Sequence, residues 1–462
     1  MSKNGKTKRA SNTQRIESLP ILEPHAAGID VGSKQHWVCA PTQDGTSREV
    51  VAFGATTAEL QDLAAWLKAR DVASVALEST GVYWIAVAEV LEEQGLEVWL
   101  VDTRQLAQVP GRNIKTDPID CQWIQRLHSY GLLRRAFRPT EVIAQLRTLV
   151  RDKAILVAES ADWMRRMQKS LDQMNVRVHR AVSDIDGTTG MAIVRAIVQG
   201  DRDPENLAKL RDYRCQKTEA QIARELQGHW RADHLFSLQQ ALKMYDSIAE
   251  RIAAYDQEIQ RQLAHMTPPE RSDQTAPPLA NANKVRGIKR RGEEQMRQAL
   301  YRVSGVDATQ IDGVGVQTVE TVISEYGTDL SQFPTEKHFI SHITLAPHMA
   351  KSGGKPLPRH KKPHSASTRV GNALRMAALA LQHSDTALGA YYRHTAQRRG
   401  ADIADFASAR KIGVLIYRLL RWGQPYIDEG AQAYEKRYQQ QQIKRLTAKA
   451  KTLGYQLIPA TA

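Results

Sequence analysis

The chain has 462 residues, 42% of them hydrophobic and 25% charged, proportions typical of a globular protein and not of a disordered or fibrous chain. Its 64 Lys and Arg against 50 Asp and Glu give a net charge of +14, which favours a polyanionic partner, above all nucleic acid. The three cysteines are far apart, which argues against a disulfide framework or a zinc site. Because no apolar run is long enough for a membrane span or a signal core, we expect a soluble cytoplasmic protein.

The N-terminal part of the chain predicts a basic arm and then an α/β domain. Residues 1–20 are basic without a hydrophobic period, so we expect a flexible arm there, followed by the domain over residues 21–140. Its expected elements are strands in HAAGIDVG, KQHWVCAPTQ and SREVVAFGA, a helix from Thr57, which caps it, to about Arg70, a strand in VASVALEST, a helix in GVYWIAVAEVLEEQG, a strand in EVWLVD and a helix from Pro118. The order βββαβαβ is typical of a ribonuclease-H-like domain, in which the first and fourth strands are parallel neighbours.

Residues 141–266 are expected to be helical. Two apolar series with a step of seven residues predict two long helices, paired either as an antiparallel coiled-coil arm or as a dimer zipper. The series are Val150, Val157, Met164, Leu171 and Val178, then Leu238, Tyr245, Ile252, Ile259 and Met266. The stretch between them, residues 184–234, is predicted to be a helical insert, and the sequence assigns it no role.

Three further segments complete the chain. Residues 267–292 are Pro-rich and then basic, which predicts a linker. Residues 293–425 contain apolar helical patterns and predict a mainly helical domain. Residues 426–462 are rich in Gln, Lys and Arg and predict a solvated helical tail. The fold class expected for the whole chain is therefore α/β plus α.

Four carboxylates fall where this topology brings them together. Asp30 lies in the first strand between apolar neighbours, where an acid is costly to bury without a cation. Glu78 ends the fourth strand, beside the first. Asp117 and Asp120 are three residues apart at the start of a helix, and therefore lie near one face of it. Such oxygen ligands suit Mg²⁺, and two Mg²⁺ ions promote phosphoryl transfer by activating the attacking group and stabilising the leaving oxygen.

Three of these acids also have a structural interpretation when taken alone. Asp117 directly precedes a proline and is a natural N-cap. Glu78 can be a surface acid at a strand end, and Asp30 a residue at a loop edge. Asp102, at the end of another strand, ranks below the four as a ligand. Taken together with the order of elements, the four acids favour a metal site.

Two features of the helical domain suit contact with nucleic acid. Gly313 and Gly315 precede a helix, either in a hairpin whose amides face a phosphate or in a tight turn between helices. Ser352 lies in the most basic segment and can attack a phosphodiester, although composition alone favours a loop that only grips phosphate. The candidate nucleic-acid-binding residues are Lys115, Gly313, Gly315, Lys351, Gly353, Gly354, Lys355, Arg359, Lys361, Lys362 and Arg369.

Six motifs in a fixed order carry a resemblance to a known family. They are GIDVGSK, ALESTGVYW, PGRNIKTDPIDCQWIQRLHSYGLL, IDGVGVQT, LAPHMAKSGGK and GNALRMAALAL, within residues 25–425. With them the chain resembles the IS-one-ten type of insertion-sequence transposases, the DEDD transposases related to the Piv DNA invertase. The resemblance implies a RuvC-like domain whose metal-binding tetrad is Asp30, Glu78, Asp117 and Asp120. It also implies a nucleophilic serine, carried over to Ser352, and so favours the nucleophile over the gripping loop.

The same resemblance implies a mechanism and partners. The serine would form a phosphoserine link with DNA in a site shared between protomers, and the arm would assemble homodimers into a tetramer. RNA-guided members use a structured RNA, encoded by the element, that pairs with donor and target DNA. We therefore expect DNA and a guide RNA as partners, association with the nucleoid when DNA is bound, and no association with membranes. The insert over residues 184–234 makes this chain longer than compact members, which leaves RNA recognition open.

Three functions remain in competition at this point. The first is a Mg²⁺-dependent transposase that excises and inserts DNA by serine transesterification. The second is a RuvC-like, structure-specific endonuclease that cuts with the acids alone, while Ser352 only contacts phosphate. The third is a catalytically inactive nucleic-acid-binding protein, in which alanine at Asp30 changes nothing. The presence of all four acids argues against the third.

Overall fold

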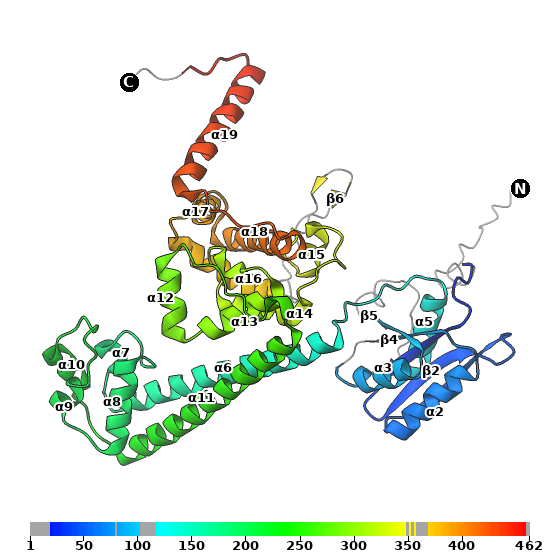
Figure 1. Ribbon diagram of the computed structural model, residues 1–462, viewed down its shortest axis with the longest axis horizontal. Helices are drawn as coiled ribbons and strands as arrows, with labels where there is room; N and C mark the ends of the chain where they lie inside the picture. The colour runs from blue at the N-terminus through cyan, green and yellow to red at the C-terminus, as the bar shows by residue number, and fades with distance from the viewer. Residues whose placement is uncertain are drawn as a thin grey trace, which may run out of the picture. The chain divides into compact units, whose positions relative to one another are not determined.

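The computed structural model describes residues 19–78, 81–101, 116–347, 351–352, 355–356 and 368–458. The chain divides into two compact units, Met1–Arg138 and Pro139–Ala462. The first unit combines a mixed sheet with helices, and the second is mostly helical (Figure 1). The expected fold class, an α/β region followed by helical regions, is confirmed at this level.

A five-stranded sheet forms the centre of the first unit. Its strands are β1 (Ala26–Val31), β2 (Gln35–Pro41), β3 (Arg48–Gly54), β4 (Ser74–Glu78) and β5 (Glu97–Val101), in the order β3-β2-β1-β4-β5. The first three strands form an antiparallel meander, whereas β4 runs parallel to β1 and β5 parallel to β4. The predicted parallel pairing of the first and fourth strands is therefore confirmed.

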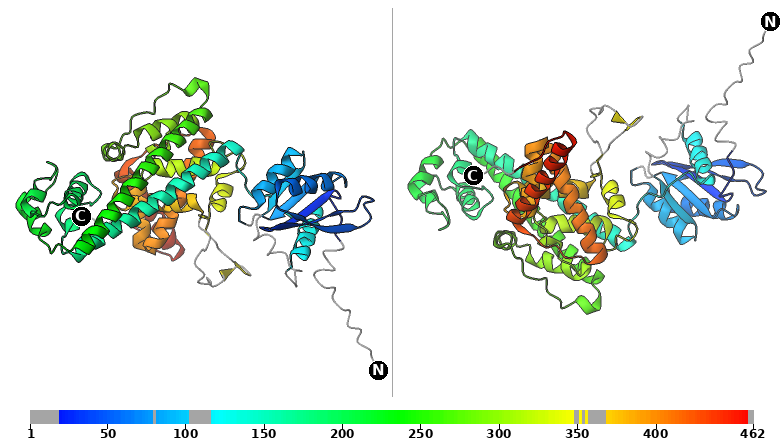
Figure 2. Two further views of the ribbon diagram at one scale, coloured as in Figure 1. Left: turned by 90° about the horizontal axis from the view of Figure 1, so that it is seen from below. Right: turned by 90° about the horizontal axis from the view of Figure 1, so that it is seen from above.

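Among the described residues of the first unit, three helices cover the two faces of this sheet. They are α2 (Thr57–Lys68), α3 (Trp84–Glu93) and α5 (Asp117–Ser129). Alternate residues of β1, such as Ala27 and Ile29, pack in one core with leucines of α2 and α3. Ala76 of β4 packs instead against Trp123 and neighbouring apolar residues of α5. Figure 2 accordingly shows α5 on the face opposite to α2 and α3.

Two predicted helix caps are wrong by one residue. Thr56, not Thr57, caps α2: its side chain accepts a hydrogen bond from the Glu59 amide, and the Glu59 carboxylate accepts one in return from the Thr56 amide. Thr116 occupies the N-cap of α5, so Asp117 is the first residue of the helix. The carboxylates of Asp117 and Asp120 consequently both belong to the first turn of α5, where the helix dipole favours negative charge.

Two long helices, α6 (Glu141–Gln173) and α11 (Ala232–Met266), lie side by side in the second unit (Figure 1). We call this pair the arm. Lys153 Nζ donates to Asp256 Oδ1 at 2.8 Å, and Gln262 Nε2 to Gln145 Oε1 at 3.1 Å. Because the partner numbers run in opposite directions, the pair is antiparallel.

The two apolar series with a step of seven residues correctly locate these helices. They do not correctly predict which residues are buried between them. Val150 and Leu171 are buried, but Val157 is 44% exposed and Val178 lies beyond α6. No residue of α6 between Val150 and Met167 is buried. The middle of the arm therefore relies on half-buried residues and polar pairs, not on a continuous apolar seam.

Four helices follow α6 at one end of the arm, and the last three of them lie within the predicted insert, residues 184–234. They are α7 (Val178–Ala181), α8 (Thr188–Gln199), α9 (Pro204–Ala208) and α10 (Glu219–Leu226). Ile193, Leu207 and Ile222 from the insert pack with Leu171 of α6 and Leu238 of α11 in one apolar core. The insert is thus built onto the arm by burial of apolar surface.

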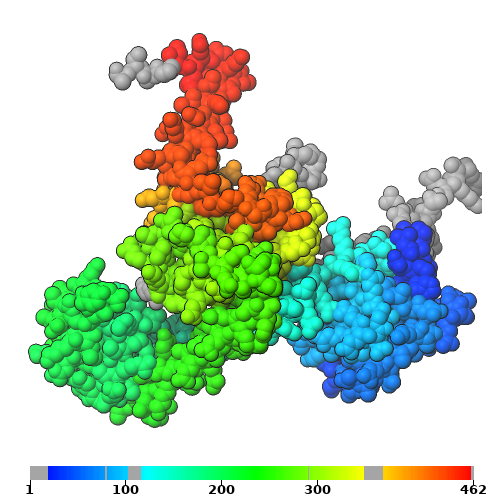
Figure 3. All heavy atoms as spheres, in the orientation of Figure 1, coloured from blue at the N-terminus to red at the C-terminus, as the bar shows by residue number. Residues whose placement is uncertain are grey.

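The rest of the second unit is a helical region followed by an outlying helix. It contains α12 (Ala282–Arg291), α13 (Glu294–Ser304), α14 (Val316–Tyr326), α15 (Glu336–His342), α16 (Arg369–Leu379), α17 (Ala387–Arg399), α18 (Ala401–Trp422), α19 (Gly430–Thr452) and the two-residue strands β6 (Lys351–Ser352) and β7 (Lys355–Pro356). The segment expected to be a linker includes α12. The tail helix α19 buries none of its residues and projects from its neighbours (Figure 3). Within the described ranges, no helix is long and apolar enough to cross a membrane.

Candidate active site

The register of β1 and β4 sets Asp30 beside Glu78. Gly28 pairs with Ala76 and Ile29 with Leu77, so the next step in the same register brings the two acids together. Neighbouring strands lie about 4.8 Å apart, and alternate residues point to the same face. Asp30 and Glu78 are both half-buried, at the carboxyl ends of two parallel strands. Such ends are where open α/β sheets bind ligands.

The packing of α5 on β1 sets the other two acids over the same edge. Gln125 Nε2 donates to the Ala26 carbonyl at 3.0 Å, and a Cβ on Gly28 would lie 2.2 Å from the Gln125 amide nitrogen and 2.6 Å from the Cys121 carbonyl oxygen. Helix and strand therefore run in opposite directions in direct contact. Asp30 is two residues beyond Gly28 and therefore on the same face of β1, so it faces the first turn of the helix.

That first turn contains Asp117, which is exposed, and Asp120, which is 5% exposed. Burial raises the pKa of the Cys121 thiol to about 12, and the negative charges of Asp30 and Asp120 contribute to the same shift. Both carboxylates thus lie within electrostatic reach of one thiol. The structure brings three of the predicted acids, Asp30, Glu78 and Asp120, to one edge of the sheet, and Asp117 lies in the same first turn of α5 as Asp120.

The other end of α5 is fixed by a buried polar pair. Ser74 Oγ and His128 Nε2 are 2.9 Å apart, and both side chains are buried between β4 and α5. Burial lowers the pKa of His128 to about 4, so the imidazole is neutral at neutral pH. Sequence reasoning missed this pair, because neither residue belongs to a motif with a recognisable spacing.

The carboxylates suit Mg²⁺ by ligand type. Asp and Glu oxygens are the ligands that hard divalent cations take in proteins. Among the described residues, however, no group of three or more His, Cys, Asp or Glu side chains is arranged to hold a metal ion. The carboxylates at this edge of the sheet are therefore suitable ligands for Mg²⁺, but the described residues do not form a complete coordination shell.

The predicted glycine pair is described in the second unit, and its two members differ. Gly313 has a φ of +80°, and a Cβ there would lie 2.4 Å from the Ala377 carbonyl oxygen of α16. Gly315, the N-cap of α14, has open space where a Cβ would be. Gly313 is needed for the turn and for packing, whereas Gly315 leaves the start of α14 open to a ligand.

Buried polar groups hold this turn in place. Tyr426 donates to Asp312 Oδ2 at 2.8 Å, and Lys284 Nζ donates to the carbonyls of Thr309 and Ile311 at 2.5 and 2.7 Å. Burial lowers the pKa of Lys284 to about 8. The sequence analysis included Lys284 in the basic part of a predicted linker, residues 267–292, whereas in the structure its ammonium group is buried and binds backbone carbonyls.

Ion pairs connect α14 to the arm. Arg151 makes two hydrogen bonds of 2.8 Å to the Glu325 carboxylate, and Arg147 also pairs with it. Lys153 bridges Asp256 of α11 and Glu320 of α14, at 2.8 and 2.5 Å. Periodicity gives no sign of these pairs, because their members lie more than a hundred residues apart in sequence.

Ser352 lies in a small hairpin of which the structure describes only the paired backbone. Ser352 pairs with Lys355 and Lys351 with Pro356, in antiparallel register. Arg369, the first residue of α16, is exposed. The remaining predicted binding residues lie outside the described ranges: Lys115, Gly353, Gly354, Arg359, Lys361 and Lys362.

Comparison with known families gives two matches. Residues 27–176 match a model of IS110-type DEDD transposases, described as "Transposase". Residues 307–393 match the model described as "Transposase IS116/IS110/IS902 family". The first match contains the edge of the sheet that bears Asp30 and Glu78, together with the first turn of α5; we call this region the carboxylate edge. The second match contains Gly313, Gly315 and Ser352. A search of curated proteins gives no match.

Proposed function

Because the chain belongs to the IS110 family of transposases, we propose that it excises and inserts an insertion sequence by cutting and rejoining DNA strands. The observation that carries this proposal is the in-register placement of Asp30 beside Glu78, under the first turn of α5. The element order and the strand order also support a RuvC-like domain. The net charge of +14 suits a DNA-binding protein.

We assign the metal-binding role to the four carboxylates Asp30, Glu78, Asp117 and Asp120. Two Mg²⁺ ions held there would polarise phosphate oxygens and stabilise the leaving oxygen. The sheet fixes Asp30 and Glu78, and the close packing of Gly28 against α5 fixes the helical turn that bears the other two. The partial positive charge at the start of α5 offsets part of the repulsion among these acids.

Ser352 supplies the nucleophile in this proposal. Its Oγ attacks a backbone phosphorus, a deoxyribose oxygen leaves, and the resulting phosphoserine ester conserves the bond for rejoining. Gly315, at the open start of α14, and Arg369 contact phosphates. A guide RNA encoded by the element directs the choice of donor and target DNA. Homodimers assemble into a tetramer through the arm, paired as an antiparallel coiled coil.

A strand-exchange assay tests this function. Purified protein, RNA transcribed from the flanks of its element, and labelled donor and target DNA are combined with Mg²⁺. Recombinant product is expected from the wild type and from Asp44→Ala, which removes an exposed turn acid, but not from Asp30→Ala or Ser352→Ala. Cleavage that survives Ser352→Ala would support the structure-specific nuclease instead. Wild-type product from Asp30→Ala would contradict the metal assignment.

A further inference from the structure

The insert contains a basic loop with an exposed aromatic ring. The family matches end at residue 176 and resume at residue 307, so the insert lies outside both. Between α9 and α10, residues 209–217 contain one acid, Asp212, and the cations Lys209, Arg211, Arg214 and Lys217. In the middle of this loop, Tyr213 is 85% exposed.

Hydrogen bonds fix the backbone of the loop. The Asp212 amide donates to Thr189 Oγ1 of α8 at 2.9 Å, and the Cys215 amide donates to the Asp212 carbonyl at 2.9 Å. Arg211 Nη1 donates to the Lys217 carbonyl at 3.1 Å. The loop therefore presents the ring of Tyr213 to solvent on a tethered turn, which lowers the entropic cost of binding a partner there.

The guanidinium of Arg214 is held close to this ring. It lies 5.4 Å from the ring centroid of Tyr213 and makes hydrogen bonds of 2.8 and 3.2 Å to the Asp212 carboxylate. The guanidinium thus lies over one face of the ring, and the 85% exposure of Tyr213 leaves ring surface on which a nucleobase can stack.

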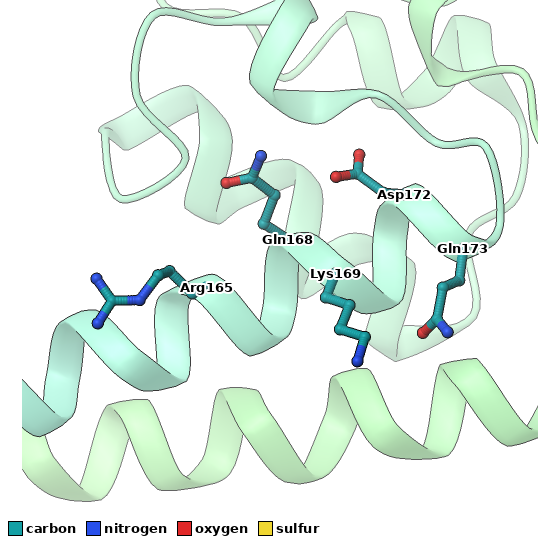
Figure 4. A pocket seen from close by; sticks show the side chains of 5 residues that line it. All are labelled: Arg165, Gln168, Lys169, Asp172 and Gln173. Carbon is teal, nitrogen blue, oxygen red and sulfur yellow. The ribbon is translucent and has the colours of Figure 1, made fainter.

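A groove on α6 that is lined by charged and amide residues is connected to the loop through α7. It has a volume of about 450 Å³ and is lined by Arg165, Gln168, Lys169, Asp172 and Gln173 (Figure 4). Asp172 Oδ1 lies 3.2 Å from Nδ1 of His179 on α7. Lys217 donates to the carbonyl of the next residue, Arg180. Because α7 contacts both, we treat the groove and residues 209–217 as one feature, the arm-tip surface.

We propose that the arm-tip surface binds single-stranded nucleic acid. An unpaired base stacks on Tyr213, the cations of residues 209–217 contact phosphates, and the strand continues toward Arg165 and Lys169 of the groove. A single exposed ring suits an unpaired base, because the faces of bases inside a duplex are already covered by their neighbours. This inference rests on the proposed function and deepens it by naming unpaired nucleotides as a partner of the insert.

Fluorescence anisotropy of full-length Asp30→Ala protein in EDTA tests binding without cleavage. The ligands are a labelled 12-nucleotide RNA, the DNA strand of the same sequence, and the corresponding blunt DNA duplex. Stacking contributes ~1–3 kcal/mol per base, so Tyr213→Ala should weaken single-strand binding roughly 5- to 150-fold. Tyr213→Phe keeps the ring and should bind as the parent does. The control Phe236→Ala, which removes a 63% exposed ring of α11, should have no effect.

A second variant tests the cations. The slope of log affinity against log salt concentration reports how many counterions are released on binding. Lys209→Gln combined with Lys217→Gln should lower that number by about one to two, whereas Lys243→Gln should leave it unchanged. Preference for RNA or for DNA would identify the strand and support the proposal. Single-strand binding that is unchanged in Tyr213→Ala would overturn it, as would an equal loss for the duplex.

The two proposals fail in different ways. If single-strand binding depends on Tyr213 but the wild type forms no recombinant product, the proposed function is refuted and the proposal for the arm-tip surface stands. Normal strand exchange without any Tyr213 dependence of binding would refute the arm-tip surface alone. Because Tyr213 is exposed, its substitution should leave the fold intact, and circular dichroism of the variant is the check.

Discussion

The carboxylate edge and the serine hairpin are scaffolded in different ways. Asp30 and Glu78 extend strands whose inner residues Ile29 and Leu77 have no exposed surface. Ser352 lies on a two-residue strand that pairs, within the described residues, only with the two residues of β7. The acids are therefore positioned by strands of a packed core, whereas the described pairing of β6 with β7 consists of two residue pairs.

Because of this difference, substitutions at the carboxylate edge and at the serine hairpin should have different effects. Around the acids, a change in the core alters position and stability together, because α5 packs directly on β1. Around the serine, chemistry and stability should separate, because within the described residues the strand that bears Ser352 pairs only with the two residues of β7.

Asp30→Asn should reduce the strand-cleavage rate about 10³-fold. The change keeps the shape of the side chain but removes a charged metal ligand, and each 1.36 kcal/mol of lost transition-state stabilisation costs a factor of ten. Single-turnover cleavage with Mg²⁺ measures the rate, and Asp44→Asn is the matched control in the same unit. A cleavage rate within threefold of wild type would show that the edge is not catalytic.

The first unit should lose stability as the pH falls from about 6.5 toward 4. Burial lowers the pKa of His128 from 6.5 to about 4, so the unfolded chain binds a proton that the folded chain excludes, and acid favours unfolding. The loss amounts to at most about 3 kcal/mol. Hydrogen exchange of peptides from β1 and α5 across this range measures it. The same profile in His128→Gln would contradict the assignment.

Gly28→Ala should destabilise the first unit by about 2 kcal/mol. The new methyl group would lie 2.2 Å from the Gln125 amide nitrogen, so α5 must move away from the sheet, and overpacking typically costs ~1–3 kcal/mol. Denaturant unfolding, combined with hydrogen exchange of α5, measures the effect. Gly315→Ala, which has open space for its methyl group, should leave stability unchanged. Equal stability of Gly28→Ala and wild type would mean that α5 does not pack tightly on β1.

Gly315→Ala should weaken DNA binding several-fold without loss of stability. A methyl group at the open N-terminus of α14 obstructs the approach of a phosphate to the first amides of the helix. Filter binding at two salt concentrations, alongside thermal melting, separates the two properties. A lowered melting temperature with unchanged affinity would assign Gly315 to packing and not to binding.

The carboxylate edge was accessible to sequence reasoning because local patterns determine it. The apolar runs around Asp30 and Glu78 indicate buried strands, and the order of elements makes those strands parallel neighbours. The step of three residues between Asp117 and Asp120 puts both in one helical turn. These relations need no knowledge of distant contacts.

Other features depend on contacts that no local pattern encodes. The burial of Lys284 follows from the carbonyls of a turn about 25 residues away, and the pairing of Arg151 with Glu325 spans 174 residues. The exposure of Val157 shows the same limit, because a heptad predicts a helix face but not the partner that covers it. The N-cap of α2, by contrast, has a local signature: Thr56 lies three residues before Glu59, which is the spacing of a capping box, whereas Thr57 does not.

The most direct test of the account is the capture of a covalent protein–DNA adduct. Wild type, Ser352→Ala and Asp30→Ala are incubated with guide RNA, labelled DNA and Mg²⁺, then denatured and separated by electrophoresis. The account predicts a labelled adduct in the wild type that both substitutions abolish. Efficient cleavage without any adduct, undiminished in Ser352→Ala, would contradict it.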